Sequence, residues 1–274
     1  MSNQMIERQN DLHADCSQCF GLCCVALPFA KSADFAMDKD GGTPCVNLRE
    51  DYLCGIHSQL RDKGFKGCTV YECFGAGQKV SQITYAGTSW RGDSEVTEQM
   101  FKVFPIMQQL HEMLSYLDEA LRREETKAIH AQLKEAYQET KVYTLLSPEA
   151  VLKLDIPTLR AGISKWLSMA GELVGNTRAN KQRTKYKTID FIGAKLKNKN
   201  FQGANLRGIL FLAADLRGAD MRAAELLGAD LRDADLSGAD LTEAIFLTQA
   251  QVNAAKGDQE TKLPTGLNKP GHWV

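Results

Sequence analysis

The sequence predicts a multidomain protein with a small Cys-rich metal-binding domain, an α-helical middle and a C-terminal solenoid. Three observations predict this order. All eight cysteines lie between residues 16 and 73, residues 95–178 carry apolar residues at helical spacing, and residues 189–246 repeat every five residues. With 274 residues, of which 43% are hydrophobic, the chain can bury a sizeable core, and two or three modules suit this length.

The five-residue repeat has an apolar centre at twelve successive steps. Only Leu, Phe or Met fills that position: Phe191, Leu196, Phe201, Leu206, Phe211, Leu216, Met221, Leu226, Leu231, Leu236, Leu241 and Phe246. A small residue, usually Ala, stands two places before most of these centres. A period of five fits neither the 3.6-residue period of a helix nor the two-residue period of a strand. Such a repeat predicts a solenoid.

The units Ala-Asp-Leu-Arg-Gly at 214–218 and Ala-Asp-Leu-Ser-Gly at 234–238 resemble the pentapeptide-repeat family. The resemblance implies a right-handed quadrilateral β-helix whose centres point inward. Four repeats make one coil, so residues 189–246 would form about three coils. Some members of that family imitate DNA and bind gyrase through a strongly acidic surface. Residues 189–246 carry nine acids and seven bases, which favours a stacking scaffold with salt-bridged faces over a DNA mimic.

The second signal is the cysteine cluster, in the order Cys16-x2-Cys19-x3-Cys23-Cys24, Cys45, Cys54-x2-His57 and Cys68-x4-Cys73. Residues 1–15 are polar and no apolar run is long enough to span a membrane, so we expect a cytoplasmic protein without a membrane partner. In a reducing cytosol clustered thiols are more often metal ligands than disulfides. Disulfides or free redox thiols are the alternative.

Nine side chains are candidate metal ligands: Cys16, Cys19, Cys23, Cys24, Cys45, Cys54, His57, Cys68 and Cys73. One site needs four, so not all of them belong to a single ion. Adjacent cysteines such as Cys23 and Cys24 seldom bind the same ion, and one of them could serve a second site or pack as a small hydrophobe. For His57 a ligand and a structural hydrogen-bonding role are equally compatible with the spacing.

The arrangement of Cys16, Cys19, Cys23 and Cys24, with the later cysteines in order, resembles the CxxCxxxCC family of zinc- or iron-chelating domains over residues 12–80. The resemblance implies a bound metal, which in some relatives is an iron-sulfur cluster. Zinc sites usually pair two close knuckles, whereas the later cysteines here are spread out. This spread slightly favours an iron-sulfur cluster over zinc as the cofactor.

Two short motifs that follow the cysteines in the chain do not indicate catalysis. Gly75-Ala76-Gly77-Gln78 begins like a dinucleotide fingerprint, but Val80 stands where the third glycine would be, so a Gly-rich turn is the better interpretation. His111-Glu112 begins a zinc-protease motif that the following residues do not complete. No catalytic residue is therefore predicted, and whether the chain is an enzyme stays open.

The middle of the chain carries an apolar stripe with alternating gaps of four and three: Val96, Met100, Val103, Met107, Leu110, Leu114, Leu117 and Leu121. Because Pro105 interrupts the stripe, the helix either begins near it or kinks there. Residues 129–143 predict an antiparallel partner, Ser147-Pro148 predicts a helix cap, and Pro157 predicts the start of another helix. The stripe favours an intramolecular bundle, with a homodimer as the alternative.

These observations divide the chain into five segments: a metal-binding domain at 1–92, a helical bundle at 93–180, a basic linker at 181–188, the repeats at 189–246, and a capping helix with an extended tail at 247–274. The net charge of the whole chain is only -1, which argues against a nucleic-acid partner for the linker. The whole arrangement resembles a group of bacterial pentapeptide-repeat proteins.

The leading functional hypothesis is a non-enzymatic cytosolic metalloprotein that acts as a protein-interaction scaffold or a metal-dependent sensor, with an unidentified protein as its partner. The first alternative is an iron-sulfur enzyme or redox protein that modifies other proteins. The second is a DNA mimic that binds gyrase. An open metal position beside a concave pocket would favour the enzyme, and a continuous acidic face would favour the DNA mimic.

Overall fold

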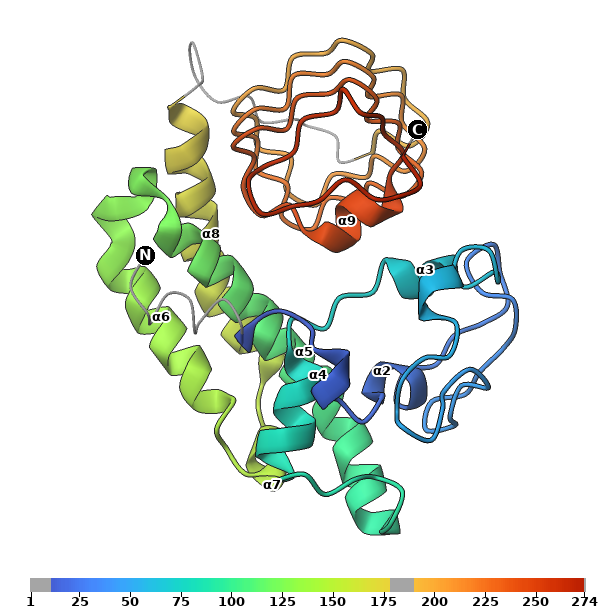
Figure 1. Cartoon of the computed structure of the whole chain (residues 1–274). Coiled ribbons are helices and arrows are strands. Elements are labelled where there is room, and N and C mark those ends of the chain that lie inside the picture. Colours follow the sequence, from blue (N-terminus) through green and yellow to red (C-terminus); the bar gives the residue numbers. More distant parts are fainter. Residues whose placement is uncertain (1–10, 178–189, 274) are drawn as a thin grey trace. The chain divides into compact units, whose positions relative to one another are not determined.

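The computed structural model describes residues 11–177 and 190–273 (Figure 1). The predicted basic linker lies outside the described residues. Contacts divide the chain into two compact units. The first contains Met1–Leu117 and Glu135–Ile163, and the second contains Asp118–Lys134 and Ser164–Val274. The first unit therefore holds all the cysteines, and the second holds the repeats.

The Cys-rich part of the first unit consists of loops and very short helices. In chain order these are η1 (Cys16–Gln18), α2 (Leu22–Val25), η2 (His57–Gln59), α3 (Lys66–Thr69), α4 (Ala76–Gln78) and the π-helical turn η3 (Lys79–Thr84). Two isolated antiparallel bridges, Phe29 with Lys39 and Leu48 with Cys54, tie the loops together. Few buried apolar side chains lie here, so turns and polar contacts carry much of the local order.

Longer helices follow, as the sequence predicted: α5 (Ser94–Arg122), η4 (Glu124–Ile129), α6 (His130–Tyr143), α7 (Pro148–Val151) and α8 (Ile156–Asn176). Helix α5 begins eleven residues before Pro105 and continues through it. A proline inside a helix removes one backbone hydrogen bond. The neighbouring Phe104 and Met107 are buried, and their packing offsets that loss. None of the described helices is long and apolar enough to cross a membrane.

The stripe on α5 is covered within the chain. Met100, Val103, Met107, Leu110, Leu114 and Leu117 are all buried. The predicted cap is present, because Ser147 accepts a hydrogen bond from the Ala150 amide. The helix predicted to start at Pro157 begins at Ile156, and Asp155 accepts a hydrogen bond from the Thr158 amide. A homodimer would therefore need a surface other than this stripe.

In the second unit the repeats stack with a register of twenty residues. Parallel bridges join Asp190 to Leu210, and the same offset continues to Glu225 and Ile245. Four repeats therefore make one coil, as predicted. The centres from Leu206 to Phe246 are essentially inaccessible to solvent. The stacked coils are drawn in orange and red in Figure 1.

The predicted strands of a β-helix are reduced to isolated bridges. Over the described residues each repeat contributes a single bridging residue and no extended strand forms. The physical reason is the turn in every repeat, which is closed by a backbone hydrogen bond such as Ala214 N to Phe211 O at 2.9 Å. Each five-residue repeat forms one side of the coil, and after its turn only one residue remains to pair with the neighbouring coil.

The solenoid continues beyond residue 246, where the sequence had placed its end. Helix α9 (Gln249–Ala254) covers the coils and begins with a capping box between Thr248 and Gln251. The chain then rejoins the stack, because Lys256 pairs with Asp235 and Lys262 pairs with Asp240. The predicted extended tail is therefore largely packed, and Trp273 is only 4% exposed in the solenoid core.

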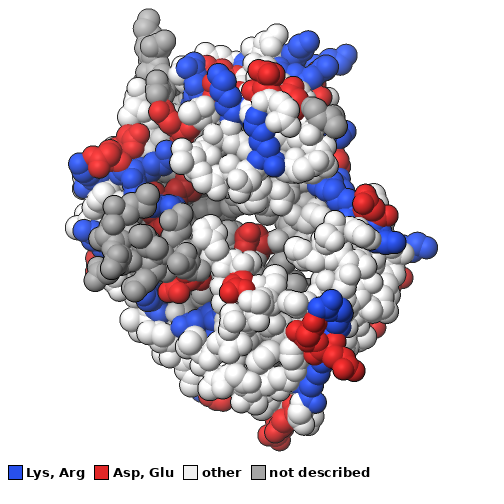
Figure 2. Space-filling view, in the orientation of Figure 1, with Lys and Arg blue, Asp and Glu red and all other residues white. Residues whose placement is uncertain are grey.

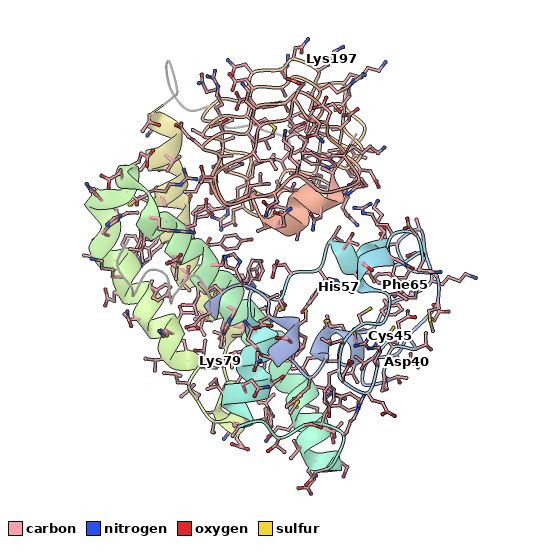
Figure 3. The ribbon with its side chains drawn as sticks, in the orientation of Figure 1. Asp40, Cys45, His57, Phe65, Lys79 and Lys197 are labelled. Carbon is pink, nitrogen blue, oxygen red and sulfur yellow. The ribbon has the colours of Figure 1, made fainter. Side chains whose placement is uncertain are left out.

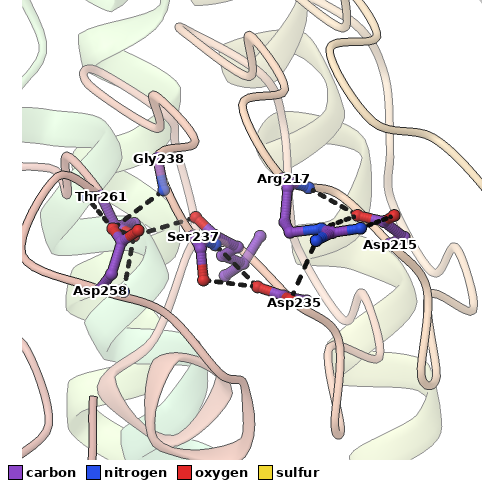
Figure 4. Close-up of polar contacts among 8 residues, drawn as sticks. Asp215, Arg217, Asp235, Ser237, Gly238, Asp258 and Thr261 are labelled. Carbon is purple, nitrogen blue, oxygen red and sulfur yellow. Dashed lines mark hydrogen bonds and ion pairs between the residues drawn. The ribbon is translucent and has the colours of Figure 1, made fainter. Parts of the chain in front are cut away.

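Outside the coils, acids and bases pair with one another. Arg217 binds both carboxylate oxygens of Asp215, and it lies 3.8 Å from Asp235 of the next coil (Figure 4). Arg222 with Asp220 and Arg232 with Asp230 repeat the arrangement. Figure 2 shows basic and acidic atoms interspersed over the solenoid face in view. These pairs neutralise much of the acidic charge on the solenoid.

Candidate metal centre

The nine predicted ligands line one cavity of about 610 Å³ within the first unit. They reach it from η1, α2, η2, α3 and the loops between them, and Figure 3 labels Cys45 and His57 among these side chains. All eight cysteines are free thiols, so no disulfide closes the region. The structure therefore gathers residues that are up to 57 positions apart, from Cys16 to Cys73, around a single space.

One group of thiols lies against α4. A methyl group built on Gly77 would stand 2.7 Å from the Sγ of Cys19 and 3.9 Å from the Sγ of Cys73. Burial raises the pKa of Cys19 to about 11, and the neighbouring Cys73 adds to that rise. Burial also raises the pKa of Cys16, again with a contribution from Cys73. Buried thiols that lie close together resist ionisation, because burial disfavours each thiolate and each thiolate repels the next.

A second group surrounds Cys68. Burial raises its pKa to about 12, and the charges of Cys24, Cys45 and Cys54 add to the rise. Burial likewise raises the pKa of Cys54, with smaller contributions from Cys24 and Cys45. A backbone hydrogen bond of 2.9 Å from Cys45 N to Cys24 O joins two members of the group. These four thiols therefore share one neighbourhood, which reaches the first group because Cys24 also raises the pKa of Cys16.

Cys23 and Cys24 connect the two groups. Their sulfurs are 4.0 Å apart, far beyond the length of about 2.05 Å of a disulfide bond. The pKa of Cys23 is raised first by its contact with Cys24 and then by burial, and that of Cys24 is lowered by the same contact. Metal ions would relieve the repulsion among these thiols by binding them as thiolates.

A buried ammonium group lies beside the thiols. Lys39 is only 6% exposed, and its Nζ donates to the carbonyl oxygens of Val25, Asp40 and Thr43 at 3.2, 3.0 and 3.0 Å. Burial lowers the pKa of Lys39, and the nearby Cys45 and Cys24 oppose that shift. A buried cation is stable when an anion lies close to it, and thiolates at Cys24 and Cys45 would supply that charge.

A residue with a buried hydroxyl group also forms part of the cavity wall. The Oη of Tyr71 has no hydrogen-bond partner among the described residues, and Tyr71 lines the cavity. Burial raises the pKa of Tyr71, followed by the charges of Cys73, Cys23 and Cys19. A phenol that stays protonated is a hydrogen-bond donor, and a thiolate or sulfide is a suitable acceptor for it.

The thiols surround the cavity without being drawn together at its centre. Among the described residues, no group of three His, Cys, Asp or Glu side chains has the arrangement that would hold a metal ion. His57 is exposed at the cavity edge. The donors fit a thiophilic metal by their chemistry and number, and binding would require the sulfurs to move inward.

The repeats in the second unit match known proteins. The model of the pentapeptide-repeat family matches residues 211–246 in eight copies. A relative from Bacillus subtilis (strain 168), the uncharacterized protein YybG, is 64% identical over 268 residues, which cover 96% of this chain and 95% of the relative. The chain is a pentapeptide-repeat protein. The similarity to YybG extends well beyond the repeats and includes most of the Cys-rich part of this pentapeptide-repeat protein.

A solved structure is also similar to this pentapeptide-repeat protein. It is a pentapeptide repeat protein from the thylakoid lumen of Arabidopsis thaliana, determined at 1.7 Å resolution. The identity is 27%, the match covers 27% of this chain and 55% of that one, and the TM-score is 0.10. The matched part thus spans about half the length of the solved protein.

Sequence reasoning did not identify Lys39, Tyr71 or Gly77 as parts of the site. A single lysine usually lies in solvent and a single tyrosine usually packs in a core, so neither stood out. The Gly-rich segment was interpreted as a turn, whereas Gly77 lies in α4 and leaves space for Cys19. No spacing along the chain indicates this role, because Cys73 lies before α4 and Cys19 is distant in the sequence.

Proposed function

We propose that the chain is a non-enzymatic metalloprotein, in which a thiolate-bound metal stabilises the first unit and the solenoid offers a surface to a protein partner. The observation that carries the proposal is the cavity of about 610 Å³ lined by eight free cysteines and His57. Support comes from the buried ammonium group of Lys39, for which thiolates would be the counter-charge. The metal would serve structure or sensing.

The test is elemental analysis with an ultraviolet-visible spectrum, on protein purified without oxygen and without a metal-binding tag. Stoichiometric zinc in a colourless protein would support a structural or sensing metal. Iron with acid-labile sulfide and a brown colour would identify the cofactor as an iron-sulfur cluster. Protein that folds fully with neither metal, and that binds none when zinc or iron and sulfide are supplied, would overturn the proposal.

We propose that the solenoid acts as a protein-interaction scaffold. We also propose that its coils are right-handed and four-sided. The ion pairs of Arg217, Arg222 and Arg232 with their aspartates argue against a continuous acidic face, so DNA mimicry is not favoured. The chain has a mass of 30.3 kDa. A mass of twice this value in analytical ultracentrifugation would show that a second copy of the chain is one partner. Inhibition of DNA supercoiling by gyrase in the presence of the chain would revive the DNA mimic.

A second candidate function, an iron-sulfur enzyme or redox protein that modifies other proteins, is favoured by the same cavity. Its volume is within the range of small-molecule sites, and the buried hydroxyl of Tyr71 is a polar group without a described partner. An iron-sulfur cluster with one iron free of protein ligands would support this candidate, because such an iron is open to substrate. A cluster or ion held by four protein ligands would oppose it.

A further inference from the structure

We propose that a second copy of this chain binds one side of the solenoid, so that two copies lie side by side. The proposal rests on the proposed scaffold function and adds the surface and the partner to it. Four repeats make one coil, and each repeat forms one side of it. The side in question contains the repeats centred on Phe191, Phe211 and Leu231, and we call it the Ile192 side.

Aliphatic side chains on the outside of the coils are confined to two sides. The residues directly before and after each centre form the outer surface, and most of them are charged or polar. In the described repeats from 190 to 247, the aliphatic ones are Ile192, Leu210 and Leu212 on the Ile192 side, and Leu227, Ile245 and Leu247 on a second side. We call the second one the Glu225 side, and its repeats are centred on Leu206, Leu226 and Phe246.

Helices of the same unit cover the Glu225 side. Helix α8 approaches it closely, because a methyl group built on Gly171 would collide with the Glu225 carboxylate. The end of α5 reaches the same side, where Glu119 accepts a hydrogen bond from the Phe246 amide at 3.1 Å. The outward Ile245 is accordingly inaccessible to solvent. In this solenoid, outward aliphatic residues therefore mark a side that is covered.

The Ile192 side keeps its aliphatic residues in contact with solvent. Ile192 is 51% exposed, and Leu210 and Leu212 are partly exposed. Leu212 follows Ile192 in the next coil, since Gly193 N donates to Leu212 O at 2.9 Å. Because Leu210 lies two residues before Leu212 on the same side, the three side chains form one patch over the first two coils. By comparison with the Glu225 side, we expect a partner to cover this patch.

Charges beside the patch favour a second copy as the partner. In the third coil the Arg232 side chain is 59% exposed and pairs with Asp230 at 2.6 Å. When two copies face each other, a two-fold axis parallel to the stack places the residue before each centre opposite the residue after it. Asp230 then meets Arg232 of the second copy, and this pair occurs twice. Leu210 likewise meets Leu212 of the second copy, so charges and aliphatic groups are both matched.

The charges also determine the direction of the second copy. If the two solenoids ran in opposite directions, the first coil of one would face the third coil of the other. Asp190 would then lie opposite Asp230, and the two carboxylates would repel each other. Arg232 would lie opposite the apolar Ile192. The two copies should therefore run in the same direction, with each coil facing the same coil of the second copy.

The first experiment measures the mass of the full chain by sedimentation equilibrium over a range of concentrations. We expect twice 30.3 kDa at high concentration. Leu212→Asp and Arg232→Asp should each raise the dissociation constant of the dimer about tenfold or more, because a charge enters the apolar contact or faces a like charge. Arg222→Asp is the matched control, since its ion pair with Asp220 has the same length of 2.6 Å but lies on the opposite side of the coil.

The second experiment exchanges charges between two copies. Arg232→Asp has two acids at the position of the ion pair and Asp230→Arg has two bases, so each variant alone should be a monomer. An equimolar mixture should regain the double mass, since every acid then faces a base of the other variant. If a charge variant unfolds in a circular-dichroism melt, the mass of Leu212→Asp still decides the test.

The results distinguish this inference from the proposed metal binding. A chain that stays at 30.3 kDa at every concentration would overturn the second copy as the partner, and so would a dimer that Leu212→Asp and Arg232→Asp leave intact. A mixture of the two charge variants that stays monomeric would overturn the two-fold pairing of Asp230 with Arg232. None of these results changes the metal content, so the elemental analysis tests the metalloprotein proposal separately.

Discussion

The Cys-rich region and the solenoid reach an ordered structure by opposite means. In the solenoid each coil repeats the contacts of the coil below, with Leu216 directly surrounded by other buried centres and the backbone paired every twenty residues. The Cys-rich region has short helices, two isolated bridges and many thiols whose pKa values are raised by burial. The comparison teaches that repetition stabilises one unit, whereas the other is held by turns and polar contacts that occur once each, which the proposed metal would reinforce.

Removal of metal should have the largest effect and should affect one region only. Because structural zinc contributes on the order of 10 kcal/mol to the folding of small zinc domains, removal of the proposed metal with a chelator should expose residues 16–73 to amide hydrogen exchange. Residues 196–246 should keep their protection, since their backbone pairing involves no thiol. Equal loss of protection in both regions would contradict the contrast.

Leu216→Lys should produce the largest effect of a single substitution in the solenoid. Leu216 is completely buried, and an unpaired charge at that position should cost about 5 kcal/mol or more, enough to unfold the coils. Leu216→Ala is the graded control, with an expected loss of about 3 kcal/mol. Thermal melts followed by circular dichroism measure both, and a small effect of Leu216→Lys would show that the centre does not point inward.

A pH effect should come from His111 in the first unit. Its Nδ1 lies 2.8 Å from the Phe74 carbonyl and must carry the proton, and burial lowers the pKa of His111 to about 4. The unfolded chain has a pKa near 6.5, so it binds the proton first as the pH falls. The contribution of His111 to stability should be constant above pH 6.5 and should fall by about 3 kcal/mol between pH 6.5 and 4.

The control is His111→Gln, which can donate to the same carbonyl without titrating. Urea unfolding of the two proteins between pH 4 and 7 isolates the His111 contribution, because carboxylates contribute equally to both. A difference that does not change with pH would show that His111 is not held in its neutral form.

Arg217→Ala should have the smallest effect. Its side chain is half exposed and its ion pairs with Asp215 and Asp235 lie on the surface, where salt and side-chain entropy cancel most of the attraction. We expect the melting midpoint to stay within experimental error of the unchanged protein. A large decrease would mean that the outer ion pairs, and not only the interior, hold the coils together.

The sequence predicted the solenoid well because its inward positions repeat and can be counted directly. The same method missed the return of the chain at Lys256 and Lys262, because those residues and Trp273 follow no repeat. The helices were predicted from the spacing of the stripe on α5, but the sequence left open whether that helix begins near Pro105 or continues through it. Features that repeat along the chain can be recognised in a sequence, whereas a tertiary contact that occurs only once cannot.

For the candidate site, the sequence predicted which side chains gather but not which of them are neighbours in space. The clustering of thiols indicated one region, and all nine side chains do line one cavity. Their neighbours depend on the path of the loop after Lys39 and on the packing of Cys19 against Gly77, which are long-range contacts. Spacing along the chain carries no information about either.

The packed end of the solenoid has a consequence for how copies of the chain behave. A stack of paired backbone groups presents, at an open end, the same donors and acceptors that another copy could bind, and such ends promote filaments. Here α9 lies over the coils, Lys256 and Lys262 occupy pairing positions, and the Trp273 indole donates to Ala255 O at 3.0 Å. Polymer growth at this end is blocked by the chain's own C-terminal residues.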